Sequence, residues 1–188
     1  MPGRLAPGEP SRYPCEMNLA TLESILRALD AARVRYLVAG GVAVLAHGYA
    51  RFTADVDLVV ALQRENILAA LGALRGLGYR AAVPITDEQF ADERERERIR
   101  AEKGMMVLNL FSDAHRDTAI DIFVTEPFDF DAEYAAAPLQ EVGPGARARF
   151  VTIRTLIDMK SRVGRPRDLD DVEHLRMILE EGSGGRNG

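Results

Sequence analysis

Apolar residues repeat along the chain with two different periods, which predicts alternating helices and strands. Spacings of three and four residues are typical of amphipathic helices, whereas alternation or a short apolar run is typical of strands. Helices are predicted at residues 19–33, 42–50, 64–78, 86–104, 153–164 and 167–181. Strands are predicted at residues 34–40, 54–62, 79–84, 105–111 and 118–124. This order predicts an α+β (α/β) fold in which helices cover a β-sheet.

The second half of the predicted fold begins with a densely charged segment. Glu and Arg residues at helical spacing indicate one solvated helix over 86–104. Residues 112–117 read as a turn, so the strands on either side of it are expected to form a hairpin. No element is predicted in the looser stretch that follows, which contains Pro127, Pro138 and Pro144.

Two helices close the predicted fold. Thr152 is the expected N-cap of the first, because a threonine hydroxyl accepts a hydrogen bond from the first turn of a helix. The second is expected to bury one stripe of apolar residues, made of Leu169, Val172, Leu175 and Ile178.

Length and composition describe one ordinary domain. The 188 residues are 47% apolar and 28% charged, which allows a hydrophobic core. We expect a disordered leader at 1–17, a single domain at 18–181 and a disordered tail at 182–188. The single cysteine, Cys15, allows no internal disulfide, and no apolar run reaches the ~20 residues that cross a bilayer. These features predict a cytoplasmic protein without membrane contact.

Net charge and histidine placement argue against two classes of function. A formal net charge of -5 does not suit a protein that coats nucleic acid. The three histidines are far apart and have no thiol neighbours, which argues against a zinc site. His47 is expected at the edge of the core or in solvent, and His115 in solvent within the hairpin turn.

Three aspartates occupy otherwise apolar strands. Because side chains alternate along a strand, Asp55 and Asp57 share one face, and Asp121 repeats the arrangement in a later strand. If the two strands are neighbours, three carboxylates meet and repel one another unless a cation lies among them. Carboxylate oxygens suit Mg²⁺, and three carboxylates can hold two ions about 4 Å apart. The alternative is that these aspartates cap turns or pair with arginines.

Two sequence motifs resemble a known enzyme superfamily. The first comprises Gly40, Gly41, Thr53, Asp55 and Asp57. It resembles the Gly-Gly turn and Asp-x-Asp strand of polymerase-beta-type nucleotidyltransferases, whose third carboxylate Asp121 fits. The second, "LIDMKSRVGRPRDLDDVEHL" at 156–175, resembles the lysine-then-RDxxDxxxL segment of abortive-infection (AbiEii-like) toxin-type nucleotidyltransferases and their small relatives. The resemblance implies a nucleotidyltransferase fold, with a mixed β-sheet, helices packed on one face and two C-terminal helices.

The resemblance also implies roles for the motif residues. Asp55, Asp57 and Asp121 would be catalytic and would bind two Mg²⁺ ions, with a nucleoside triphosphate such as ATP as substrate. Gly40 and Gly41 would bring the backbone close to the phosphates. Arg51 and Thr53 would contact phosphate or brace the loop, although Arg51 is equally well explained as an ordinary salt-bridge partner.

Lys160 continues the apolar stripe of its predicted helix, after Ile153, Leu156 and Ile157. A lysine on such a face either extends its ammonium to solvent or meets an anion inside. The resemblance makes that anion the triphosphate. Asp168 is equally well explained as a helix cap or as a nucleotide-site residue, and Asp171 lies on the same helix face.

The acceptor of the transferred nucleotide is left open by the sequence. A tRNA 3′ end, a protein side chain in a toxin–antitoxin pair and a small hydroxylated molecule are the candidates, and a partner subunit or self-association is another source of acceptor contacts. Aminoglycoside nucleotidyltransferases are expected to carry an additional helical domain that this chain lacks. The alternative functions are a non-catalytic nucleotide-binding antitoxin or regulatory module, and a different metal-dependent phosphotransfer or hydrolysis.

Overall fold

A computed structural model of the chain describes residues 18–184. The expected leader and Cys15 lie outside these residues. Within them, five strands form one sheet in the order β1-β2-β5-β4-β3. The strands are β1 (Tyr36–Val38), β2 (Asp55–Val60), β3 (Tyr79–Ala81), β4 (Val107–Ser112) and β5 (Ala119–Phe123). β2 and β5 pair in parallel and the other neighbours are antiparallel, so the sheet is mixed, as predicted.

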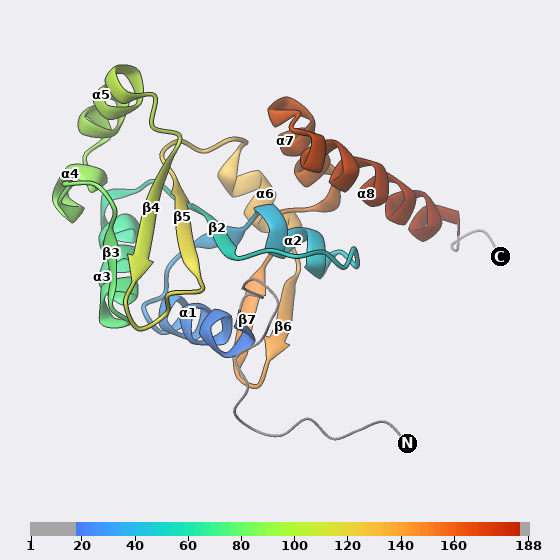
Figure 1. The fold of residues 1–188 in the computed structure, drawn as a ribbon, viewed down its shortest axis with the longest axis horizontal. Coiled ribbons are helices and arrows are strands. Elements are labelled where there is room, and N and C mark those ends of the chain that lie inside the picture. Colours follow the sequence, from blue (N-terminus) through green and yellow to red (C-terminus); the bar gives the residue numbers. More distant parts are fainter. Residues whose placement is uncertain (1–17, 185–188) are drawn as a thin grey trace.

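Helices and a second small sheet surround these strands (Figure 1). The helices are α1 (Leu19–Ala31), α2 (Gly40–Ala46), α3 (Arg64–Gly76), α4 (Asp87–Ala91), α5 (Glu93–Lys103), α6 (Phe130–Ala136), α7 (Ile153–Val163) and α8 (Pro166–Gly184). Figure 1 shows α7 and α8 at the opposite end of the molecule from α4 and α5. α8 includes residues 182–184, which were expected in the tail.

The alternation of side chains gives the main sheet one apolar and one acidic face. Val56, Leu58, Ile120 and Ile122 are buried on the apolar face, where α3 packs and α1 lies beside α3. The opposite face carries Asp55, Asp57 and Asp121. The predicted hairpin of β4 and β5 is confirmed, with Asn109 paired to Asp121.

The stretch with three prolines contains elements that the pattern analysis missed. They are α6 and an antiparallel hairpin of β6 (Leu139–Gly143) and β7 (Ala146–Arg149). The buried residues of β7 are alanines, Ala146 and Ala148, whose small side chains produce little hydrophobic alternation. Pro138 and Pro144 lie just outside the two strands, where they break no ladder hydrogen bond.

The prediction of one solvated helix over 86–104 is wrong. The chain turns at Asp92, whose side chain accepts a hydrogen bond from the Glu95 N–H and thereby caps α5. Arg96 is buried, with 5% of its surface exposed, and donates to the carbonyl of Phe90 at 2.8 Å. This contact attaches α5 to the preceding helix, so its charges are not all in solvent.

The C-terminal helices confirm most of the predicted pattern. Thr152 caps α7 by accepting from the Thr155 N–H. Val172 and Leu175 of α8 are buried, whereas Leu169 is 54% exposed, so its place in the buried stripe was wrongly predicted. The inner face of α8 is occupied near its start by Asp168 and Asp171 instead. None of the helices in residues 18–184 has the length and hydropathy of a membrane span.

Candidate functional site

The predicted carboxylates meet on the acidic face of the sheet. Asp57 of β2 is directly opposite Asp121 of β5, and Asp55 is opposite Ala119. Neighbouring strands are about 4.8 Å apart, so the side chains of Asp57 and Asp121 project side by side. The expectation that these strands are neighbours is therefore confirmed.

The electrostatics of this face are unfavourable for negative charge. Burial, together with the charges of Asp121 and Asp55, raises the pKa of Asp57 to about 6, although Lys160 and the Gly41 N–H act in the opposite direction. Burial also raises the pKa of Asp121, while a hydrogen bond from Asn109 opposes that change. The cluster therefore favours a cation or a proton among its carboxylates.

Asn109 is a site residue that the sequence analysis missed. Its Nδ2 donates to Asp121 Oδ1 at 2.9 Å from the neighbouring strand β4. The predicted hairpin could have indicated this residue, because a turn at 112–117 can pair residue 109 with residue 121. A polar residue between Leu108 and Leu110 points to the acidic face.

The glycine turn packs directly against the site. Gly40 has a left-handed φ of +58°, and a side chain there would collide with the carboxylate of Asp57. A side chain at Gly41 would collide with the Thr53 hydroxyl and the Arg51 guanidinium. Helix α2 starts at Gly40 rather than at Val42, so both glycines belong to its first turn. Only glycine fits at either position without displacing a site residue.

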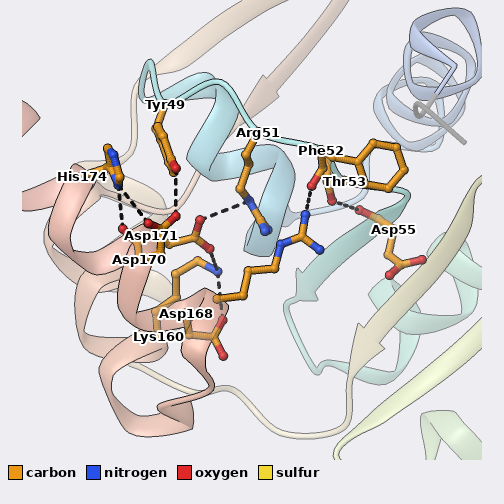
Figure 2. Close-up of polar contacts among 11 residues, drawn as sticks. Tyr49, Arg51, Phe52, Thr53, Asp55, Lys160, Asp168, Asp170, Asp171 and His174 are labelled. Atoms are coloured by element: carbon orange, nitrogen blue, oxygen red, sulfur yellow. Dashed lines mark hydrogen bonds and ion pairs between the residues drawn. The ribbon is translucent and has the colours of Figure 1, made fainter. Parts of the chain in front are cut away.

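Lys160 is buried at the end of the apolar stripe of α7, with 7% of its surface exposed. Its Nζ lies 2.7 Å from Asp171 Oδ2 and 3.3 Å from Asp168 Oδ1 (Figure 2). The ammonium therefore does not extend to solvent. It forms ion pairs within the protein and its charge also acts on Asp57.

Arg51 joins the same group from the loop before β2. Its Nε lies 3.3 Å from Oδ1 of Asp171, which is completely buried. The interpretation of Arg51 as a salt-bridge partner is thus confirmed. Thr53 donates a long hydrogen bond of 3.5 Å to the Asp55 carbonyl, which braces the start of β2.

Asp168 does not act as the helix cap that was one of its two interpretations. Helix α8 begins at Pro166, which places Asp168 in the first turn, and its carboxylate faces Lys160. The neighbouring Arg167 donates to the Phe52 carbonyl and so ties α8 to the Arg51 loop. Asp168 thus lies beside the site, in a cluster of four charged residues: Arg51, Lys160, Asp168 and Asp171.

The histidines lie away from the carboxylates in the described fold. His47 Nε2 is 2.8 Å from the Val151 carbonyl, at the edge of the core. His115 lies in the hairpin turn, as predicted, but it stacks on Tyr79 and contacts the Thr21 hydroxyl at 3.3 Å. Its placement in solvent was therefore wrong.

The acidic face matches Mg²⁺ in the chemistry of its donors, because it offers hard carboxylate oxygens. Within residues 18–184, no three His, Cys, Asp or Glu side chains are gathered closely enough to form a finished metal site. Burial and repulsion between carboxylates raise the pKa values of Asp57 and Asp121, so a cation among these side chains would be favourable. The donor set thus fits a hard divalent cation.

Comparisons with known proteins identify the fold. The lincomycin-bound lincosamide antibiotic adenylyltransferase LnuA matches with a TM-score of 0.55 and 14% identity, over 87% of this chain and 99% of LnuA. ANT(2″)-Ia in complex with adenylyl-2″-tobramycin matches with a TM-score of 0.53 and 16% identity, over 86% of this chain and 88% of that chain. The chain has a nucleotidyltransferase fold.

The comparisons also change one expectation about size. The matches cover most of both neighbours, which leaves little of either for an additional acceptor domain. An additional acceptor domain is therefore not a feature of these two neighbours, contrary to the expectation. No protein-family model matches the chain, and no curated protein matches it in sequence.

Proposed function

We propose that the protein is a Mg²⁺-dependent nucleotidyltransferase that moves a nucleoside monophosphate from a nucleoside triphosphate to an acceptor hydroxyl. The observation that carries this proposal is the register of β2 and β5, which sets Asp57 beside Asp121 with Asp55 on the same face. The fold and the glycine turn against Asp57 support it.

In this proposal Asp55, Asp57 and Asp121 hold the metal. Two Mg²⁺ ions would supply charge stabilisation for the attacking and leaving oxygens. Asp121 would complete the coordination of the second ion or accept the hydroxyl proton from its place beside Asp57. The acceptor oxygen forms a bond to the α-phosphorus, the bond from that phosphorus to the bridging oxygen breaks, and pyrophosphate leaves.

The remaining residues of the site bind the triphosphate. Lys160 and Arg51 supply positive charge, and the glycine turn admits a close approach to the backbone. Thr53 braces the loop that presents Arg51. The ammonium of Lys160 would contact both the carboxylate of Asp168 and the triphosphate of the nucleotide.

The acceptor class stays open between a tRNA 3′ end, a protein side chain and a small hydroxylated molecule. The two structural neighbours have an antibiotic or an adenylylated antibiotic bound, which favours testing a small molecule first. The likeness of residues 156–175 to toxin-type enzymes favours testing tRNA and a protein partner, including an antitoxin or a second copy of the chain.

The test is incubation of the protein with each α-labelled nucleoside triphosphate and Mg²⁺, with a lincosamide, an aminoglycoside, total tRNA or cell lysate as acceptor. We expect label on one acceptor class and none with Asp57→Asn or Asp121→Asn. His174→Gln is the control variant, because His174 lies outside the carboxylate cluster. This variant should label the acceptor as the wild type does. Label that persists in Asp57→Asn would overturn the proposal.

A non-catalytic nucleotide-binding module is the second candidate. It would share the fold and the nucleotide contacts of the first candidate but would not transfer the nucleotide. Tight binding of a nucleoside triphosphate without labelling of any acceptor would support it.

A further inference from the structure

Asp171 is unusual among the carboxylates of the molecule because it is completely buried and contacts two cations from distant parts of the chain. Arg51 comes from the loop before β2, and Lys160 comes from α7. This carboxylate holds its two cationic partners in place, because its own helix is packed on α7.

The geometry of the two pairs leaves both cations able to act elsewhere. Asp171 contacts Arg51 through Nε, and one of the terminal guanidinium nitrogens lies against Gly41. Within residues 18–184, no hydrogen bond ties down either terminal nitrogen. Lys160 lies close enough to the acidic face for its charge to act on Asp57.

The contacts of Asp171 are ionic rather than well-aligned hydrogen bonds. Neither carboxylate oxygen has a hydrogen-bond partner of good geometry among the described residues. An ammonium has three N–H donors and a guanidinium has five, so one contact with Asp171 engages only part of either group. An ionic contact fixes their positions and leaves N–H groups for a further anion.

We propose that Asp171 is a positioning residue that holds Lys160 and Arg51 side by side, next to the glycine turn, as the subsite for the phosphates of the nucleotide. This inference rests on the proposed function. Asp171 does not touch the nucleotide, and it acts through the two cations. Asp168 is the weaker partner of Lys160, since its contact is longer and its side chain is 17% exposed.

The test measures the dissociation constant of ATP and GTP for Asp171→Asn, both with Mg²⁺ and with EDTA. In EDTA there is no Mg²⁺, so the affinity depends on the side-chain cations Lys160 and Arg51 without a contribution from the metal. Asp170→Asn is the matched control: it lies one residue away and removes the same charge, but its side chain is 54% exposed and contacts Tyr49 and His174. We expect affinity to fall at least 10-fold in Asp171→Asn and less than 2-fold in Asp170→Asn.

A double variant separates positioning from general damage. Lys160→Met should lower affinity, and adding Asp171→Asn to it should lower affinity much less than Asp171→Asn does alone, because one of the two cations that Asp171 positions is already gone. Full additivity, or unchanged affinity in folded Asp171→Asn, would overturn the proposal. If Asp171→Asn does not fold, Arg51→Gln/Asp171→Asn is compared with Arg51→Gln alone, and it must bind more weakly because Lys160 has also lost its partner.

The outcomes distinguish this inference from the proposed function. Wild-type protein that binds no nucleoside triphosphate contradicts both. Wild-type protein that binds and transfers, with an Asp171→Asn variant that binds equally well, contradicts only the positioning role.

Discussion

Two neighbouring groups of charged side chains differ in their balance of positive and negative charge. On the acidic face of the sheet, three carboxylates share one side-chain amide, one backbone N–H and the distant charge of Lys160. Between the Arg51 loop, α7 and α8, two carboxylates pair with two cations at 2.7–3.3 Å. The first group is short of positive charge, and the second is neutral as a whole.

This difference separates a group that needs a ligand for charge balance from one that is balanced within the protein. A neutral buried cluster stabilises the packing of α7 and α8 only while all its members are present. An unbalanced cluster opposes folding, and a ligand that supplies the missing charge would offset this cost. The same substitution, aspartate to a neutral residue, should therefore have opposite effects on stability in the two groups.

The largest effect is expected at Asp171. Asp171→Ala leaves Arg51 and Lys160 buried without their common partner, and breaking a buried pair this way destabilises a protein by about 3–5 kcal/mol. Urea denaturation at pH 7.5 measures the free energy of unfolding. Asp170→Ala is the control, with an expected loss below about 1 kcal/mol because its contacts are exposed. A similar loss of unfolding free energy in both variants would show that the buried ion pairs of Asp171 do not stabilise the protein more than the exposed contacts of Asp170.

Asp57→Asn should have the opposite sign. Removing a charge that is disfavoured by burial and by like charges should raise the free energy of unfolding without metal, by at most about 3 kcal/mol for a pKa of about 6 instead of 3.8. Asparagine keeps an oxygen for the Gly41 N–H. Chemical denaturation in EDTA at pH 7.5 checks this. The exposed Asp55→Asn should change stability by less than about 0.5 kcal/mol, and a destabilised Asp57→Asn variant would contradict the comparison.

The stability gain should also depend on pH with a defined sign. Because the pKa of Asp57 is raised in the folded state, that state binds more protons than the unfolded chain between about pH 4 and pH 6. Asp57 therefore lowers stability progressively as pH rises through this window, and its effect is constant above it. The difference in unfolding free energy between Asp57→Asn and wild type should grow from pH 4 to 6.5 in EDTA. A difference independent of pH would place the pKa of Asp57 at its ordinary value.

The acidic face was predictable from the sequence, because it depends on patterns within single strands and on one hairpin turn. Alternation in two strands orients Asp57 and Asp121, and the hairpin turn specifies the neighbour of β5. The parallel pairing of β2 with β5 could only be assumed, since pairing between distant strands depends on packing of the whole domain. The close approach of Gly40 to phosphate stays a prediction, whereas the nearest atoms that require glycine in the structure belong to Asp57.

The second group was harder to predict. Leu169 was assigned to the buried face of α8 because a periodic pattern counts apolar residues. Ion pairs reverse that choice: Asp168 and Asp171 turn inward toward Lys160, and Leu169 turns outward. In the same way, the alanines of β7 and the break at Asp92 depend on tertiary contacts and capping, which a hydrophobic pattern does not record.

The smallest predicted effect tests whether Asn109 compensates part of the imbalance on the acidic face. Asn109→Ala removes the 2.9 Å hydrogen bond to Asp121 and should destabilise the protein by about 1 kcal/mol at pH 7.5. In an Asp121→Asn background the acceptor is neutral, so the loss should fall by about half. A double-mutant cycle in EDTA measures this coupling. Equal losses in both backgrounds would mean that Asn109 stabilises β4 by packing alone, and that the carboxylate cluster has no side-chain compensation before a cation binds.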